Sequence, residues 1–121
     1  MLVIDRRVRS LAHLASAKAY TSRIRRGKHC ALILDRNYNV VASFVNEGTV
    51  HAERGAIDEL LSHTMSHDVD HGYTLLVVRA VTSTGEIKLS KPCVDCEHAI
   101  KNCSMIRSVI FSRDHGRFGI M

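Results

Sequence analysis

The sequence predicts a layered α/β domain that contains a mixed sheet of four or five strands with helices on both faces. Segments with strand-like and helix-like patterns alternate along the second half of the chain, which is typical of layered α/β folds. Residues 73–81 are almost continuously apolar, as expected for a central strand that is covered on both faces. With 121 residues, 45% of them hydrophobic, the chain fits a single domain over 1–121.

The first expected element is an amphipathic helix between Asp5 and Gly27. Asp5 is a favourable N-cap residue, and glycine is a natural helix stop. Apolar residues at helical spacing form a narrow stripe: Val8, Leu11, Ala12, Ala15 and Ala19. Because alanine side chains are small, this helix can lie close against a sheet.

A hairpin is expected next. Residues 29–34 and 40–45 are apolar and favour strands, and the polar segment 35–39 provides the turn. Cys30 lies within the first of these apolar runs, where a buried packing role is typical for a free cysteine. A short loop, 46–50, then leads to His51.

The remaining elements follow in alternation. A second helix starts after His51, and its expected buried side carries Ala52, Ala56, Ile57, Leu60 and Leu61. After strand 73–81, residues 87–89 form a short extended piece. Pro92 opens a third helix over 93–103, in the first-turn position that proline tolerates. Strand 107–111 is expected to end the regular structure, with no assignment for 112–121.

The composition indicates an intracellular, cytoplasmic protein. No apolar run approaches the roughly 18 residues needed to span a bilayer. The N-terminus places Asp5 and an arginine pair after a very short apolar stretch, the opposite order to a secretory signal. In a reduced compartment, the spacing of Cys93 and Cys96 is more typical of metal binding or redox chemistry than of a structural disulfide.

The chain has a net charge of +5, and the excess lies near the N-terminus. The basic residues there are Arg6, Arg7, Arg9, Lys18, Arg23, Arg25, Arg26 and Lys28. Such a cluster suits phosphate, either on a nucleotide or on a polymer. A solvated helix face that promotes solubility explains the same pattern, and both interpretations stay open.

The most informative motif combines His51 and Glu53 with Cys93 and Cys96, which Pro92 precedes. One histidine and two thiolates can hold Zn²⁺ with three protein ligands, which leaves a fourth position for water, as in catalytic zinc sites. Glu53 is then the group that moves protons. His51 and Glu53 point to nearly opposite sides of a helix interior, so they can share one ion only if it lies off the helix N-terminus. We therefore expect two helix N-termini to converge on one metal, with the positive end of the dipole favouring the thiolates.

The motif His51-Ala52-Glu53 with Pro92-Cys93-Val94-Asp95-Cys96 resembles that of the zinc-dependent cytidine and deoxycytidylate deaminase superfamily. The resemblance covers roughly residues 28–111. It implies a three-layer cytidine-deaminase-like core and Zn²⁺ as the cofactor. It also implies hydrolytic deamination of a cytosine nucleoside or nucleotide (cytidine, deoxycytidine, CMP or dCMP) to the uracil form with release of ammonia, in which Glu53 protonates ring N3 and carries a proton to the departing amine.

The same resemblance implies three substrate contacts. The carbonyl of Lys91 accepts a hydrogen bond from the amine, the backbone N–H of Ala52 contacts the ring carbonyl, and Asn46 binds the sugar. A plain turn residue is the alternative for Asn46. The superfamily's free cytidine deaminases usually carry cysteine where this chain has His51, whereas histidine is found in the deoxycytidylate, tRNA-adenosine and polynucleotide-editing branches.

Many family members continue past the fourth strand with another helix and strand, where this chain has about ten residues. An open sheet edge or a bare helix face needs covering, so we expect a homo-oligomer and no membrane association. Two alternative functions stay open. One is deamination of a base within RNA or single-stranded DNA, and the other is a catalytically silent zinc-binding module.

Overall fold

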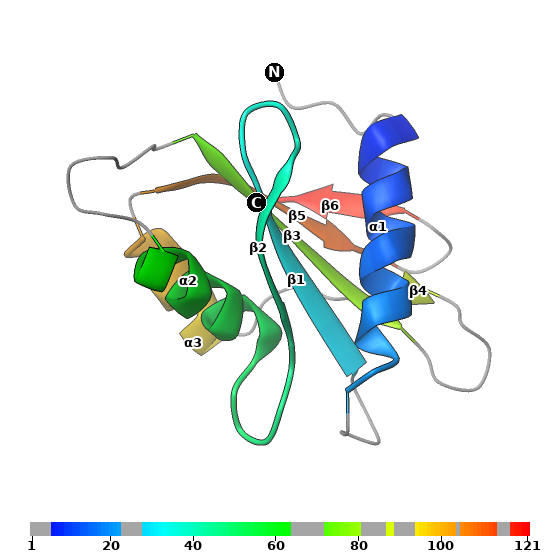
Figure 1. Ribbon diagram of the computed structural model, residues 1–121, viewed down its shortest axis with the longest axis horizontal. Coiled ribbons are helices and arrows are strands. Elements are labelled where there is room, and N and C mark those ends of the chain that lie inside the picture. Colours follow the sequence, from blue (N-terminus) through cyan, green and yellow to red (C-terminus); the bar gives the residue numbers. More distant parts are fainter. Residues whose placement is uncertain are drawn as a thin grey trace.

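In the computed structural model, a mixed β-sheet lies between one helix on one face and two helices on the other (Figure 1). The structure describes residues 6–22, 28–63, 72–80, 87–88, 94–103, 105–113 and 117–121. The helices are α1 (Arg6–Ala19), α2 (Ala52–His63) and α3 (Val94–Lys101). The strands are β1 (Lys28–Leu34), β2 (Val40–Val45), β3 (Tyr73–Ala80), β4 (Ile87–Lys88), β5 (Ile106–Ser112) and β6 (Phe118–Ile120). The predicted α/β class, with helices on both faces of a mixed sheet, is confirmed.

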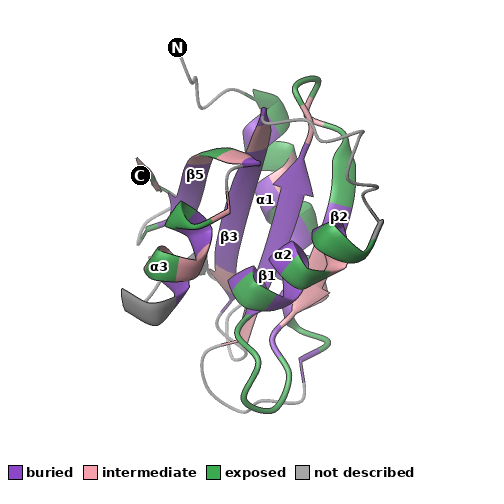
Figure 2. Ribbon diagram, turned by 90° about the vertical axis from the view of Figure 1, so that its left-hand side faces the viewer, coloured by how far each residue is buried: buried purple, intermediate pink, exposed green. Residues whose placement is uncertain are grey.

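The sheet has the strand order β2-β1-β3-β5-β6, and the two-residue β4 pairs with β3 as a sixth strand. β1 is antiparallel to both β2 and β3, β3 is parallel to β5, and β5 is antiparallel to β6. The central strands β1, β3 and β5 are largely buried (Figure 2). The apolar run at 73–81 therefore predicted the central strand correctly.

Two hydrophobic layers, one on each face of the sheet, hold the helices in place. Under α1 the layer includes Val8, Ala12, Ala15, Ala19, Cys30, Leu32, Leu34, Leu76, Val78 and Ala80. Under α2 and α3 it includes Ala31, Ile33, Ala56, Ile57, Leu60, Leu75, Val77, Ile100 and Val109. Alternate residues of β1 and β3 enter opposite layers because strand side chains alternate between faces. Each fully buried Leu, Ile or Val contributes about 1.5–3 kcal/mol.

Cys30 confirms its predicted packing role, since it is fully buried under α1. Burial raises the pKa of its thiol to about 11, so the thiol stays protonated and is a poor metal ligand. Within the described ranges, no helix has the length and apolar content needed to cross a membrane.

The ends and faces of two helices differ from expectation. α1 ends at Ala19, because Thr21 bonds the carbonyl of Lys18 through both its N–H (2.9 Å) and its hydroxyl (2.6 Å) and so closes a turn. Asp5 and Gly27 lie outside the described residues. Leu61 is 51% exposed rather than buried. Leu60 occupies the row of α2 that faces the sheet, and Leu61 follows it a third of a turn away.

The expectation that regular structure ends at strand 107–111 is wrong. β5 extends to Ser112, and β6 pairs with it antiparallel, with Phe111 opposite Gly119. A Cβ on Gly119 would lie 2.3 Å from the Phe111 ring, so glycine is needed for this close approach. The N–H of Arg113 donates to the carbonyl of Arg117 over 2.7 Å and closes the connection. A three-residue strand is too short to produce a detectable sequence pattern.

We expect Gly55→Ala to destabilise the protein by about 1–3 kcal/mol through overpacking. In a helix interior, alanine is normally about 1 kcal/mol more stabilising than glycine. Here, however, a Cβ at position 55 would lie 2.1 Å from Cδ2 of Phe44, a β2 side chain packed against the core. Urea denaturation of Gly55→Ala, Phe44→Leu and the double variant measures the effect and its coupling. The double variant should recover part of the loss. Unchanged or increased stability in Gly55→Ala would show that α2 does not need this close contact.

Candidate metal centre

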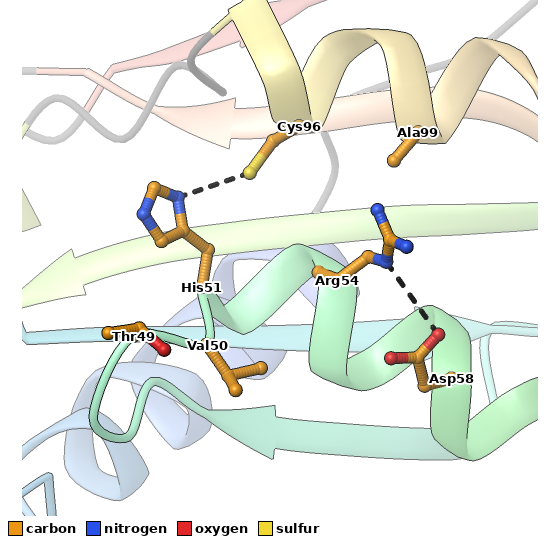
Figure 3. Close-up of a pocket in the computed structure, with 7 residues that line it drawn as sticks. All are labelled: Thr49, Val50, His51, Arg54, Asp58, Cys96 and Ala99. Atoms are coloured by element: carbon orange, nitrogen blue, oxygen red, sulfur yellow. Dashed lines mark hydrogen bonds and ion pairs between the residues drawn. The ribbon is translucent and has the colours of Figure 1, made fainter.

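His51, Glu53 and Cys96 come together where the start of α2 meets α3. Their potential ligand atoms all lie within 4.8 Å of one another, and Nδ1 of His51 lies 3.2 Å from Sγ of Cys96. Figure 3 shows the His51 side chain pointing from the start of α2 toward Cys96 on α3. Glu53 and Cys96 are each only 6% exposed, whereas His51 is exposed. This is the convergence of two helix starts that the motif geometry predicted for these three residues.

The loop before α2 positions His51. The backbones of Glu47 and Val50 exchange two hydrogen bonds, of 3.1 and 2.9 Å, around Gly48. Gly48 has a φ of 56°, in the left-handed region that glycine adopts without strain. The carbonyl of His51 then accepts from the N–H of Gly55 over 3.0 Å, which begins the helix. His51 is therefore the residue just before the first helical turn, and Glu53 lies within that turn.

The geometry suits a zinc ion. A tetrahedral zinc with bonds of about 2.0–2.1 Å to nitrogen and about 2.3 Å to sulfur separates those two atoms by about 3.5 Å. The His51–Cys96 separation of 3.2 Å needs to widen only slightly. Imidazole and thiolate are also ligands that zinc prefers. The third predicted ligand, Cys93, lies outside the described part of the chain, as do Pro92 before it and the predicted substrate contact Lys91.

Comparison with protein-family models gives a match over residues 3–113. The matching family is described as the cytidine and deoxycytidylate deaminase zinc-binding region. The chain belongs to this deaminase family. A search of curated protein sequences finds no match.

Solved structures show that this family member has a cytidine-deaminase-like fold. A cytidine deaminase from Burkholderia pseudomallei is similar with a TM-score of 0.69 and 16% identity, over 93% of this chain and 89% of the other. A dCMP deaminase from the cyanophage S-TIM5 in apo form gives a TM-score of 0.66 and 18% identity, over 93% of this chain and 87% of the other. The three-layer core that the motif resemblance implied is thereby confirmed.

Of the three predicted substrate contacts, Asn46 and Ala52 are described. Asn46 is 8% exposed at the end of β2. Its Oδ1 accepts from the N–H of His29 over 2.9 Å, and its own N–H donates to the His29 carbonyl over 3.1 Å. Its carbonyl accepts from the Ser22 hydroxyl over 2.8 Å. These hydrogen bonds hold Asn46 in place between β1 and the loop that leads to His51. Ala52 is fully buried at the start of α2.

A pocket of about 390 Å³ opens beside His51 and Cys96 (Figure 3). Arg54 lines it and forms an ion pair with Asp58 at 3.8 Å, one helical turn along α2. The other lining residues are Thr49, Val50 and Ala99. Sequence reasoning did not assign Thr49, Asp58 or Ala99 to the site, because their place depends on how α2 packs against α3, for which the sequence carries no local signal.

Sequence reasoning also missed a pair of residues outside the cluster, one of which, His29, is close enough to His51 to feel its charge. His29 on β1 lies directly opposite Arg79 on β3. Burial, together with the smaller effects of the charges of Arg79 and His51, lowers the pKa of His29 to about 4. His29 is therefore neutral at physiological pH. A charged residue paired with a half-buried histidine could be found only once the strand register was known.

We expect NMR titration to give His29 a pKa near 4. The unfolded chain has a histidine pKa near 6.5 and takes up a proton at higher pH than the folded state does. Stability should therefore be complete above pH 6.5 and fall as the pH drops from 6.5 to 4, by about 1–3 kcal/mol after allowance for partial exposure. His29→Gln should flatten this dependence in urea melts, whereas His13→Gln, on the exposed side of α1, should not. A pKa of His29 near 6.5 would contradict the expectation.

Proposed function

We propose that this protein is a zinc-dependent hydrolase that deaminates a cytosine nucleoside or nucleotide to the uracil form and releases ammonia. Candidate substrates are cytidine, deoxycytidine, CMP and dCMP. The observation that carries the proposal is the buried carboxyl of Glu53 within 4.8 Å of the His51 and Cys96 ligand atoms. A structural zinc site has no need of such a carboxylate. Membership of the deaminase family supports the same reaction.

His51 and Cys96 would hold the zinc together with Cys93. The start of α2 and the start of α3 approach each other there, so the positive ends of two helix dipoles favour the thiolate form of the cysteines. When bound, zinc lowers the pKa of a coordinated water toward about 7 and so supplies a nucleophile at neutral pH.

Glu53 moves the protons of the reaction. Its carboxylate takes one proton from the attacking water and donates it to ring N3. It then takes the second proton of that water and passes it to the amine, which leaves C4 as ammonia. Water and the cytosine ring are consumed, and the uracil ring and ammonia are formed. Because Glu53 is 6% exposed and fixed in the first turn of α2, bulk water has little access to the transferred proton.

Three groups would orient the substrate. The N–H of Ala52 lies in the first turn of α2, where backbone N–H groups have no partner within the helix, and it would bond the ring carbonyl. The carbonyl of Lys91 would accept from the amine. Asn46 would bind the sugar, and its hydrogen bond from His29 fixes the orientation of its amide at the end of β2.

We also propose that the protein forms a homo-oligomer. Both edge strands of the main sheet expose apolar side chains: Val40 and Val41 on β2, and Ile120 on β6. Exposed strand edges favour pairing with another chain. Analytical ultracentrifugation of the zinc-loaded protein measures the association directly.

A substrate panel tests the proposed reaction. The zinc-loaded protein is incubated with the four cytosine compounds, with adenosine and guanosine, and with short RNA and single-stranded DNA, and the products are identified by mass spectrometry. Conversion of at least one free cytosine compound to its uracil form is expected. Conversion of the oligonucleotides alone, with salt-sensitive binding, would instead identify a polynucleotide deaminase. If zinc is bound but none of these compounds is converted, the result supports the catalytically silent zinc-binding module.

A further inference from the structure

Two side chains without a role in the proposed proton transfers lie together at one end of the sheet. His29 of β1 and Arg79 of β3 are direct cross-strand partners. The residues two and four positions away from this pair lie in the core layer under α2: Ala31 and Ile33 on β1, and Val77 and Leu75 on β3. Because side chains alternate along a strand, His29 and Arg79 project from the same face as that layer. This is the face of the sheet on which the metal centre lies.

A chain of contacts connects this pair to the metal centre. His29 exchanges two hydrogen bonds with Asn46, through the side-chain oxygen and the backbone N–H of Asn46. The loop that follows Asn46 leads directly to His51, and His51 is close enough to act electrostatically on His29. These connections therefore run from His51 along the loop to Asn46, then to His29 and its cross-strand partner Arg79.

Arg79 has an unusual environment for a cation. Its Nε is buried and has no hydrogen-bond partner among the described residues. Its backbone N–H is held separately, by the hydroxyl of Ser112 on β5 at 3.2 Å. A buried donor left unsatisfied on a charged group is costly, so its presence in a folded protein calls for an explanation, such as a bound ion or a role in catalysis. Guanidinium stays charged at all physiological pH values, and its fork of donors matches a phosphate group.

We propose that Arg79 binds the 5′-phosphate of the substrate, so that the protein prefers a cytosine nucleoside monophosphate over the nucleoside. The inference rests on the proposed function. It follows the order of groups in a nucleotide, with the base at the metal centre, the sugar at Asn46 and the phosphate beyond it at Arg79. A dianionic phosphate supplies the acceptor that the buried Nε lacks among the described residues.

Steady-state kinetics of zinc-loaded Arg79→Gln test this preference. The values of kcat/KM for dCMP and CMP should fall about 10- to 100-fold, mainly through KM, because a charge-assisted hydrogen bond is lost. The values for deoxycytidine and cytidine should stay within about twofold of the original. Arg107→Gln is the matched control, since Arg107 is an exposed arginine near the start of β5, opposite the amino end of β3 rather than its carboxyl end. It should leave all four substrates unaffected.

Equal losses for nucleotides and nucleosides would overturn the assignment, as would no loss for nucleotides or a nucleoside preference in the unaltered protein. If the unaltered protein deaminates none of the four compounds, the proposed function fails by itself. In that case, the affinities for dUMP and deoxyuridine, measured by calorimetry, test whether Arg79 binds phosphate. Tighter binding of dUMP that Arg79→Gln abolishes supports it, whereas equal binding of both compounds overturns it.

Discussion

Replacing Glu53 by glutamine is expected to reduce the rate of deamination about 10²- to 10⁴-fold while leaving zinc bound. Glutamine has nearly the shape of glutamate but cannot accept and return a proton. The Glu53 side chain is buried, with only 6% exposed, so solvent cannot readily replace the missing carboxylate. The loss should appear in kcat, because the proton transfers belong to the chemical step.

The measurement pairs kcat with the zinc content of the same preparation. Glu59→Gln is the matched control, because Glu59 lies on α2 beyond the turn that faces the metal centre and is half-buried. Its kcat should be unchanged. Wild-type kcat in Glu53→Gln at full zinc content would exclude Glu53 as the proton carrier. If the protein is a silent zinc-binding module, neither the unaltered protein nor Glu53→Gln will show activity.

Replacing Cys96 by serine is expected to weaken zinc binding by more than about 100-fold, since even the loss of a residue that only supports a ligand costs about 10- to 100-fold. The serine hydroxyl stays protonated near neutral pH and is a poor substitute for a thiolate. The stabilisation that zinc gives the folded state should disappear with it, about 2.7 kcal/mol at a zinc concentration 100 times Kd. Deamination should fall in parallel with bound zinc.

Competition with a chromogenic chelator measures the zinc affinity, and thermal unfolding with and without chelator measures the stabilisation. Cys103→Ser is the matched control, because Cys103 is a partly buried thiol packed against the core just after α3. It should keep zinc affinity close to that of the unaltered protein. Equal zinc affinity in Cys96→Ser, or an equal loss in Cys103→Ser, would remove Cys96 from the ligand set.

The clustering of His51, Glu53 and Cys96 could be predicted because its signals are local. His51 and Glu53 are two residues apart at the start of a helix, and Cys96 lies four residues after a proline, a residue that favours the first turn of a helix. If these residues share one zinc ion, helix geometry requires the two starts to converge, and the His51–Cys96 distance of 3.2 Å agrees with that expectation. The buried central strand was predictable for the same reason, since its apolar run is continuous in the sequence.

Features that depend on register or on close packing could not be predicted. His29 and Arg79 are neighbours only because β1 pairs with β3 in one register, which no pattern near either residue specifies. The close approach of β6 to β5 depends on Gly119 against the Phe111 ring, a contact between two strands rather than a property of either one. Leu61 has the character of a core residue but lies beyond the row of α2 that the sheet covers.

Ammonia release measured against bound zinc tests the catalytic metal centre most directly. Metal-free protein is titrated with Zn²⁺, and the initial rate of ammonia release from saturating cytosine nucleotide or nucleoside is followed at each step. The rate should rise in proportion to bound zinc and reach a plateau at one zinc per chain. No ammonia at any zinc loading, or a rate independent of bound zinc, would contradict a zinc-dependent deaminase centre at His51, Glu53 and Cys96.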